Sequence, residues 1–168
     1  MRRKMHNLGF TLMELVLVLA VIGICAAVAA PNLRGFARGR MLPNTATRLA
    51  STARWCRAMA LSEGVEYRLN LDPTNGRWWV TKTDDGGTQF TTVPEEIGRE
   101  YTVPEGIAIQ SVAFKSEAQT TDQGAFIAFR AGGKTDPATI TLASETNAVD
   151  VTCESPLTTY HVAKGGGR

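Results

Sequence analysis

Residues 10–30 of the 168-residue chain read FTLMELVLVLAVIGICAAVAA. Eighteen of these 21 residues are apolar, and Glu14 is the only charged residue among them. A helix rising about 1.5 Å per residue would be roughly 31 Å long here, which matches the hydrocarbon core of a bilayer. The polar stripe of a soluble protein's surface helix is missing. The stretch therefore predicts a transmembrane helix.

A short basic leader, residues 1–9, precedes this helix. Such a leader holds the N-terminus in the cytoplasm while the helix inserts. A cleaved secretory signal peptide is the ordinary alternative, and Ala27-Val28-Ala29 would supply its small-x-small site. Two features disfavour it: the apolar stretch is longer than a signal core of about 7–15 residues, and a carboxylate inside the bilayer is costly.

Cleavage between Gly9 and Phe10 would offset the cost of placing the Glu14 carboxylate in the bilayer. Phe10 would then carry a free amine, and Glu14 would be the fifth residue of the new chain. A carboxylate in the first helical turn meets the positive end of the helix dipole. It can also pair with the terminal amine of its own or of a neighbouring chain, and such a buried pair fixes register more than it adds stability.

Helical periodicity returns after the apolar stretch. Pro31 cannot donate a helical hydrogen bond, so a kink or break is expected there. Between residues 44 and 62 one apolar face is formed by Leu49, Ala53, Cys56 and Ala60. Three arginines lie off this face: Arg48, Arg54 and Arg57. We interpret them as a solvated side near lipid phosphates, with binding to a partner as the alternative.

The period changes from 3.6 to 2 after Gly64, which indicates strands. Strands are expected at about 65–71, 77–82, 107–114, 124–130, 138–143, 148–153 and 157–163. Residues 84–106 hold prolines, paired glycines and acids, and predict a long loop. Trp78 and Trp79 must point to opposite faces of their strand, so one of them is expected in the core. The sequence thus predicts an α+β fold.

The leader, Gly9 and the run Phe10-Thr11-Leu12-Met13-Glu14-Leu15 resemble the class III signal of type IV pilins and pseudopilins. The resemblance implies cleavage after Gly9 by a prepilin peptidase, N-methylation of Phe10, and Glu14 as the assembly residue. It also implies a single-pass protein of the inner membrane, with its N-terminus in the cytoplasm and its globular domain in the periplasm. Lipid would surround the helix before assembly.

Three further stretches resemble the GspH minor pseudopilins of type II secretion and the related FimT/FimU minor pilins. They are Leu49 to Leu71, the hairpin from Asp72 through Trp79-Val80, and Phe126 to Leu142. The resemblance implies a pilin-like fold, assembly with other pseudopilins or minor pilins at the tip of a periplasmic pseudopilus, and contact with secreted cargo. The alternative is a minor type IV pilin that acts in pilus assembly or DNA uptake. We divide the chain into a leader (1–9), a membrane and assembly helix (10–30), a kinked amphipathic helix (31–63) and a β-rich domain (64–168).

The sequence predicts neither catalysis nor a cofactor. It has no G-x-S-x-G, no H-E-x-x-H and no phosphate-binding glycine loop. His6 belongs to the leader, and His161 is expected to face solvent. The loop acids Asp84, Asp85, Glu95, Glu96 and Glu100 match no calcium-loop spacing, so solvated acids are preferred to a calcium site.

Cys56 and Cys153 are both expected to face the core of a domain in an oxidising compartment. They either form a disulfide or remain two separate buried thiols. Cys25 belongs to the apolar helix and is interpreted as packing. No spacing of the three cysteines predicts a metal site.

Charge is distributed unevenly along the chain. Residues 10–62 carry six arginines and one acid, whereas residues 63–168 carry 9 basic and 15 acidic residues. DNA binding requires lysines and arginines that neutralise phosphates, so this acidic domain disfavours DNA as a partner.

Overall fold

The computed structural model describes residues 11–84, 89–116, 119–121 and 124–163, and the side chains of residues 28–38 and Thr121 lie outside this description. Contacts divide the chain into two compact units, Met1–Gly39 and Arg40–Arg168. One helix, α1 (Leu12–Glu63), contributes to both.

Helix α1 has a defined cap at each end. The hydroxyl oxygen of Thr11 accepts a hydrogen bond from the amide of Glu14 at 3.2 Å, which satisfies one of the free amides of the first turn. At the other end Gly64 adopts a φ of 69°, and its amide donates to the carbonyl of Ala60 at 3.1 Å. This left-handed glycine ends the helix.

The helix runs unbroken through Pro31, so the prediction of a break is wrong. A proline removes a single helical hydrogen bond, and the bonds on either side can hold the turn. A kink at this residue stays a prediction.

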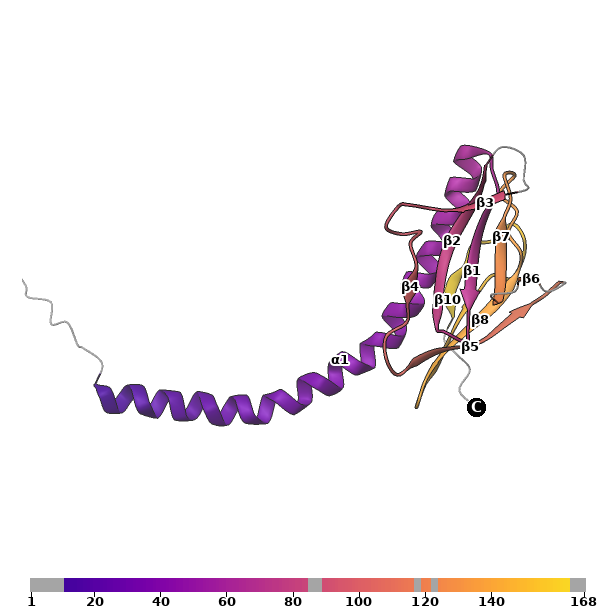
Figure 1. Ribbon diagram of the computed structural model, residues 1–168. Helices are drawn as coiled ribbons and strands as arrows, with labels where there is room; N and C mark the ends of the chain where they lie inside the picture. Colours follow the sequence, from indigo (N-terminus) through magenta and orange to yellow (C-terminus); the bar gives the residue numbers. More distant parts are fainter. Residues whose placement is uncertain (1–10, 85–88, 117–118, 122–123, 164–168) are drawn as a thin grey trace, which may run out of the picture. The chain divides into compact units, whose positions relative to one another are not determined.

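After α1, the described residues of the second unit form two antiparallel sheets (Figure 1). The first sheet has the strand order β3-β2-β1-β7-β6, with β4 also paired to β2, and the second has the order β10-β9-β8-β5. The strands are β1 (Tyr67–Asp72), β2 (Arg77–Asp84), β3 (Gln89–Thr92), β4 (Tyr101–Thr102), β5 (Ile107–Phe114), β6 (Thr120–Thr121), β7 (Gly124–Phe129), β8 (Ala138–Ser144), β9 (Ala148–Thr152) and β10 (His161–Ala163).

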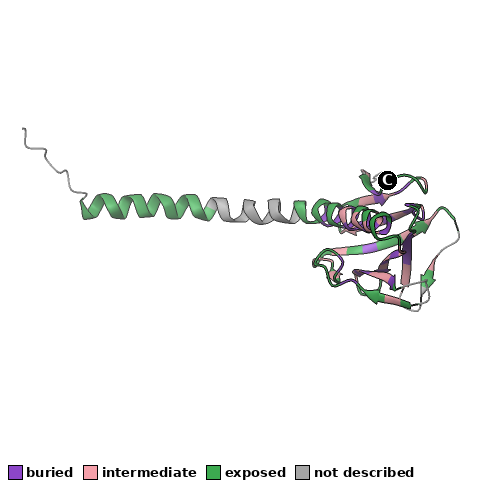
Figure 2. Cartoon of the chain, turned by 90° about the horizontal axis from the view of Figure 1, so that it is seen from above, coloured by how far each residue is buried: buried purple, intermediate pink, exposed green. Residues whose placement is uncertain are grey.

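Helix α1 and both sheets share one core (Figure 2). The predicted helix face is buried, as Leu49, Ala53, Cys56 and Ala60 are fully enclosed. The first sheet contributes alternate residues of β1 and β2, and the second contributes buried residues of β8 and β9. Trp78 enters this core with 1% of its surface exposed, and Trp79 is half-buried, which confirms the predicted division of the pair.

The predicted long loop at residues 84–106 contains two short strands, β3 and β4. Both strands pair with β2, and the segment between them also hydrogen-bonds to β2. The amide of Val93 donates to the carbonyl of Val80, and the amide of Val80 donates to the carbonyl of Gly98. This segment therefore hydrogen-bonds along most of the free edge of β2, and an edge covered in this way is protected from unwanted strand pairing.

Candidate assembly site

Gly9 and Phe10, the predicted processing residues, lie outside the described residues. Glu14 is described, and its side chain is exposed in the first turn of α1. With Thr11 as N-cap, Glu14 occupies the third helical position. Thr11-Leu12-Met13-Glu14 therefore has the sequence of a capping box, a signal from which the role of Thr11 could have been predicted.

The first turns of α1 are exposed (Figure 2), and most of their side chains are apolar. Leu12 exposes 82% of its surface and Leu17 exposes 65%. Leucines, valines and isoleucines are exposed on every side of the helix between residues 12 and 24. Water contact with so much apolar surface is unfavourable, so this stretch requires cover by lipid or by other chains.

No helical stretch among the described residues is both long enough and apolar enough to cross a membrane. The predicted span of residues 10–30 includes Phe10 and the side chains of residues 28–30, which lie outside the description.

Arg48 and Arg54 are exposed and Arg57 is half-buried, which agrees with a solvated side of the helix, and all three also contact other groups of the protein. The guanidinium of Arg48 lies 4.3 Å from the ring centre of Tyr101 on β4. Arg57 donates to the carbonyl oxygens of Leu157 and Thr158. Arg54 bonds only locally, to the hydroxyl of Ser51. Sequence spacing showed that these residues lie off the core face but could not show which loops approach them.

Cys56 and Cys153 are both buried, and in the structure they are free thiols. The sulfur of Cys153 lies 3.2 Å from the carbonyl oxygen of Ser155 and 3.4 Å from the hydroxyl of Thr158. Burial raises the pKa of the Cys56 thiol, which disfavours the reactive thiolate. The arrangement is that of two separate packing residues.

Two largely buried carboxylates organise turns, and the sequence did not single out either of them. Asp72 accepts hydrogen bonds from the side-chain and backbone amides of Asn75, at 2.8 and 3.1 Å, and from Arg77 at 3.0 Å. The bonds from Asn75, together with Arg77, lower the pKa of the Asp72 carboxyl.

The second of these carboxylates, Asp136, lies 2.6 Å from the guanidinium of Arg130 and accepts from the amide of Ala128 at 3.2 Å. The hydroxyl of Tyr160 donates to the backbone carbonyl oxygen of Asp136 at 2.8 Å. Burial raises the pKa of the Tyr160 hydroxyl. Both carboxylates are therefore engaged in holding the fold.

The described residues bring together no group of three or more histidines, cysteines or acids that could hold a metal ion. Of the acids weighed as calcium ligands, Glu100 lies 3.3 Å from Arg77, and Asp85 lies outside the description. His161 is exposed, as predicted.

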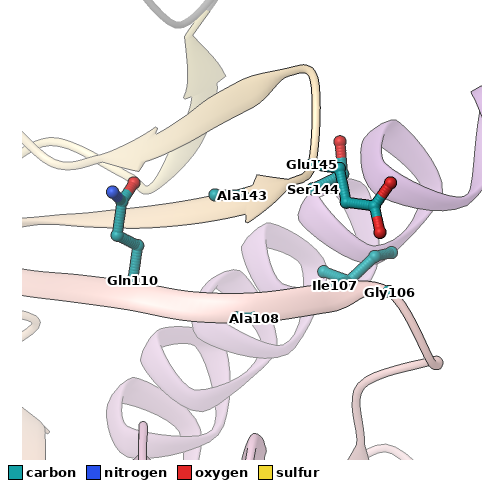
Figure 3. Close-up of a pocket in the computed structure, with 7 residues that line it drawn as sticks. All are labelled: Gly106, Ile107, Ala108, Gln110, Ala143, Ser144 and Glu145. Atoms are coloured by element: carbon teal, nitrogen blue, oxygen red, sulfur yellow. The ribbon is translucent and has the colours of Figure 1, made fainter.

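An open hollow of about 420 Å³ lies at one end of the second sheet (Figure 3). Alanines of β5 and β8, Ala108 and Ala143, pair across it, with the side chains of Gln110 and Glu145 at opposite ends. Its lining also includes Gly106, Ile107 and Ser144, and Glu145 is its one ionisable residue.

A long N-terminal helix followed by antiparallel sheets, with an apolar start, defines a pilin-like protein. Two family models match the chain: the Prokaryotic N-terminal methylation motif at residues 4–30, and Type II transport protein GspH at residues 45–155. The chain belongs to the GspH family.

Solved structures agree with this fold. The minor pseudopilin EpsH from the Type 2 Secretion System of Vibrio cholerae superposes with a TM-score of 0.61, 14% identity, and coverage of 76% of this chain and 99% of that chain. The type IV minor pilin FimU of Pseudomonas aeruginosa superposes with a TM-score of 0.51, 10% identity, and coverage of 77% and 91%. The predicted α+β pilin-like fold is confirmed.

A relative in sequence is Type II secretion system protein H of Xanthomonas campestris pv. campestris, which is 32% identical over 77 residues. The match covers 46% of this chain and 44% of the relative, so it spans less than half of that protein's length.

Proposed function

We propose that this protein is a minor pseudopilin of a type II secretion system, which assembles through its N-terminal helix into a periplasmic pseudopilus, at the tip, to support protein secretion. The observation that carries the proposal is the joining of a methylation motif at residues 4–30 to a GspH domain at residues 45–155. The exposed apolar surface of residues 12–24 supports assembly, because it needs cover that other subunits can supply.

The proposed sequence of events begins in the inner membrane. Residues 10–30 span the bilayer with the globular domain in the periplasm, and a prepilin peptidase cleaves between Gly9 and Phe10. Phe10 is then N-methylated. On assembly the helix leaves lipid for a bundle of pseudopilin helices, and the carboxylate of Glu14 pairs with the terminal amine of a neighbouring subunit. The globular domain is free to contact other minor subunits and secreted cargo.

Glu14→Ala is the direct test of the assembly step. The variant should be processed normally and should lose incorporation into the pseudopilus and secretion of a type II substrate. Glu96→Ala is the matched control, since Glu96 is an exposed loop acid. Normal assembly of the Glu14→Ala protein would refute the proposed role of this residue.

Mass spectrometry of the mature protein tests processing separately. We expect the chain to begin at Phe10 with a methylated amine. Any other mature N-terminus would contradict the proposal, whatever the behaviour of the Glu14 variant.

A minor type IV pilin that acts in pilus assembly or DNA uptake is the second candidate, favoured by the fold likeness to FimU. A gel shift at physiological salt, together with secretion by a strain lacking the gene, separates the two. We expect no DNA binding and a secretion defect, because residues 63–168 carry a net charge of −6.

A further inference from the structure

Strand β5 is an edge of the second sheet, because among the described strands it pairs with β8 alone. The amide of Lys115 donates to the carbonyl of Pro137 at 3.0 Å, next to the Phe114–Ala138 pair of the ladder. In an antiparallel ladder, hydrogen-bonded and non-hydrogen-bonded pairs alternate. Val112 and Phe114 are therefore in non-hydrogen-bonded pairs, and their amide and carbonyl groups point away from β8. No described residue hydrogen-bonds to these groups.

None of the described residues covers the Ser111–Lys115 part of the β5 edge in the way that the edge of β2 is covered. The edge of β2, by contrast, is hydrogen-bonded by strands β3 and β4 and, between them, by Val93 and Gly98. Residues 107–114 contain neither a charge nor a proline, two of the devices that block strand addition, and Lys115 is the first charged residue after them. A bulge between Ile109 and Ser111 interrupts the strand once. The regular part of the open edge is therefore Ser111–Lys115.

We propose that the Ser111–Lys115 edge binds an extended strand of another pseudopilin, which adds a fifth strand to the second sheet. This inference rests on the proposed function, which supplies the class of partner. The outward groups of Val112 and Phe114 provide main-chain hydrogen bonds, as in other cases of strand addition. The exposed side chains of Ser111 and Ala113 are small, so they leave room beside the incoming strand.

Charge favours a different chain over a second copy of this one. The ammonium of Lys115 is exposed and donates to the carbonyl oxygen of Glu154 at 3.4 Å. A carbonyl does not neutralise this charge. A second copy of the edge would bring a second lysine and no carboxylate within Ser111–Lys115. The complementary strand is uncharged apart from an acid opposite Lys115.

Photocrosslinking in cells that express the full-length protein and the other pseudopilins tests the inference. A benzophenone amino acid is placed at Ala113, at Ala58 as a second exposed alanine on α1, and at Leu15 in the apolar stretch. We expect adducts with another pseudopilin from Ala113 and Leu15 but not from Ala58. Adducts from Leu15 without one from Ala113, or an Ala113 adduct with a second copy of this chain, would overturn the inference alone. The loss of pseudopilin adducts at both positions would overturn the proposed function as well.

A charge added to the edge gives a second, independent measurement. Ala113→Lys adds a cation beside Lys115, and Ala58→Lys adds the same charge on α1. With the crosslinker at Ser111, we expect the adduct yield to fall about fivefold in Ala113→Lys and to stay within about twofold in Ala58→Lys. An equal yield in the two variants, at equal protein levels, would contradict strand addition at this edge.

Discussion

The two stretches of α1 share a backbone conformation and differ in where their apolar side chains lie. Between residues 12 and 24 the large apolar side chains are exposed, whereas Leu49, Ala53 and Cys56 are fully buried by the sheets of their own chain. A continuous helix can therefore serve two purposes. Its second stretch completes a folded domain, and its first stretch needs partners from outside the described residues.

Side-chain size follows the same division. The buried face of the second stretch is rich in alanine, at positions 46, 50, 53 and 60, which lets sheets approach closely. The first stretch is built from leucine, valine and isoleucine, which present much more apolar area. The small alanines of the second stretch fit a fixed set of neighbours. The larger side chains of the first stretch fit either lipid or a bundle of similar helices.

Truncation of one leucine in each stretch should separate them most strongly. Leu49 is 0% exposed and Leu17 is 65% exposed. Leu49→Ala removes core contacts and leaves a cavity, so we expect the free energy of unfolding to fall by about 2–5 kcal/mol. Leu17→Ala should leave it unchanged within about 0.5 kcal/mol.

Urea unfolding of the full-length protein in detergent, followed by tryptophan fluorescence, measures this difference. All three tryptophans (Trp55, Trp78 and Trp79) belong to the second unit, so the signal reports on that unit. Equal destabilisation by both substitutions would erase the contrast between the stretches.

The periodic parts of the molecule could be predicted from the sequence. Leu49, Ala53, Cys56 and Ala60 repeat at helical spacing, and burial follows from that spacing. The alternation in β1 likewise places Tyr67, Leu69 and Leu71 inside. Periodicity succeeds where one face of an element meets a large core, because the same face must then be apolar over several turns or residues.

A glycine of the sheets gives the next largest effect. Gly124 begins β7 with a φ of 132°, and a Cβ there would lie 2.2 Å from the carbonyl oxygen of Leu71. Gly124→Ala therefore clashes with backbone that cannot move freely, and we expect a loss of about 1–3 kcal/mol in the free energy of unfolding.

Gly132→Ala is the control for this substitution, because a Cβ at Gly132 would meet nothing within 4 Å. Urea unfolding of the two variants should give clearly different midpoints. A Gly124→Ala protein as stable as the Gly132→Ala protein would show that the start of β7 can shift away from β1.

Features that depend on contacts between segments far apart in the sequence could not be predicted. β3 and β4 are four and two residues long and lie at an edge, so neither has a repeating pattern of burial. The contacts of Arg48 with Tyr101 and of Arg57 with the carbonyls near residue 158 join segments far apart in the chain. At the candidate site, sequence reasoning singled out Glu14 but not its capping residue, Thr11.

Acid should weaken the globular unit through Asp72. Hydrogen bonds from Asn75 and the neighbouring Arg77 hold the pKa of this carboxyl below its ordinary value, which is about 3.9. A lowered folded-state pKa contributes stability above the unfolded pKa, and that stability is lost as the pH falls through the folded value. The urea midpoint should therefore decline below about pH 4, and Asp72→Asn should decline less between pH 7 and pH 3. An identical decline in both proteins would exclude Asp72 as a source of acid sensitivity.

The smallest effect concerns the last residue of α1. Glu63 lies 3.0 Å from the ammonium of Lys82 on β2, and their side chains are 32% and 29% exposed. A double-mutant cycle with Glu63→Gln and Lys82→Met should give a coupling of about 0.2–1 kcal/mol, reduced in high salt, because water screens a pair at the surface. A larger coupling that salt leaves unchanged would mean that this ion pair, and not only the buried apolar face, fixes the second stretch of α1 to the sheets.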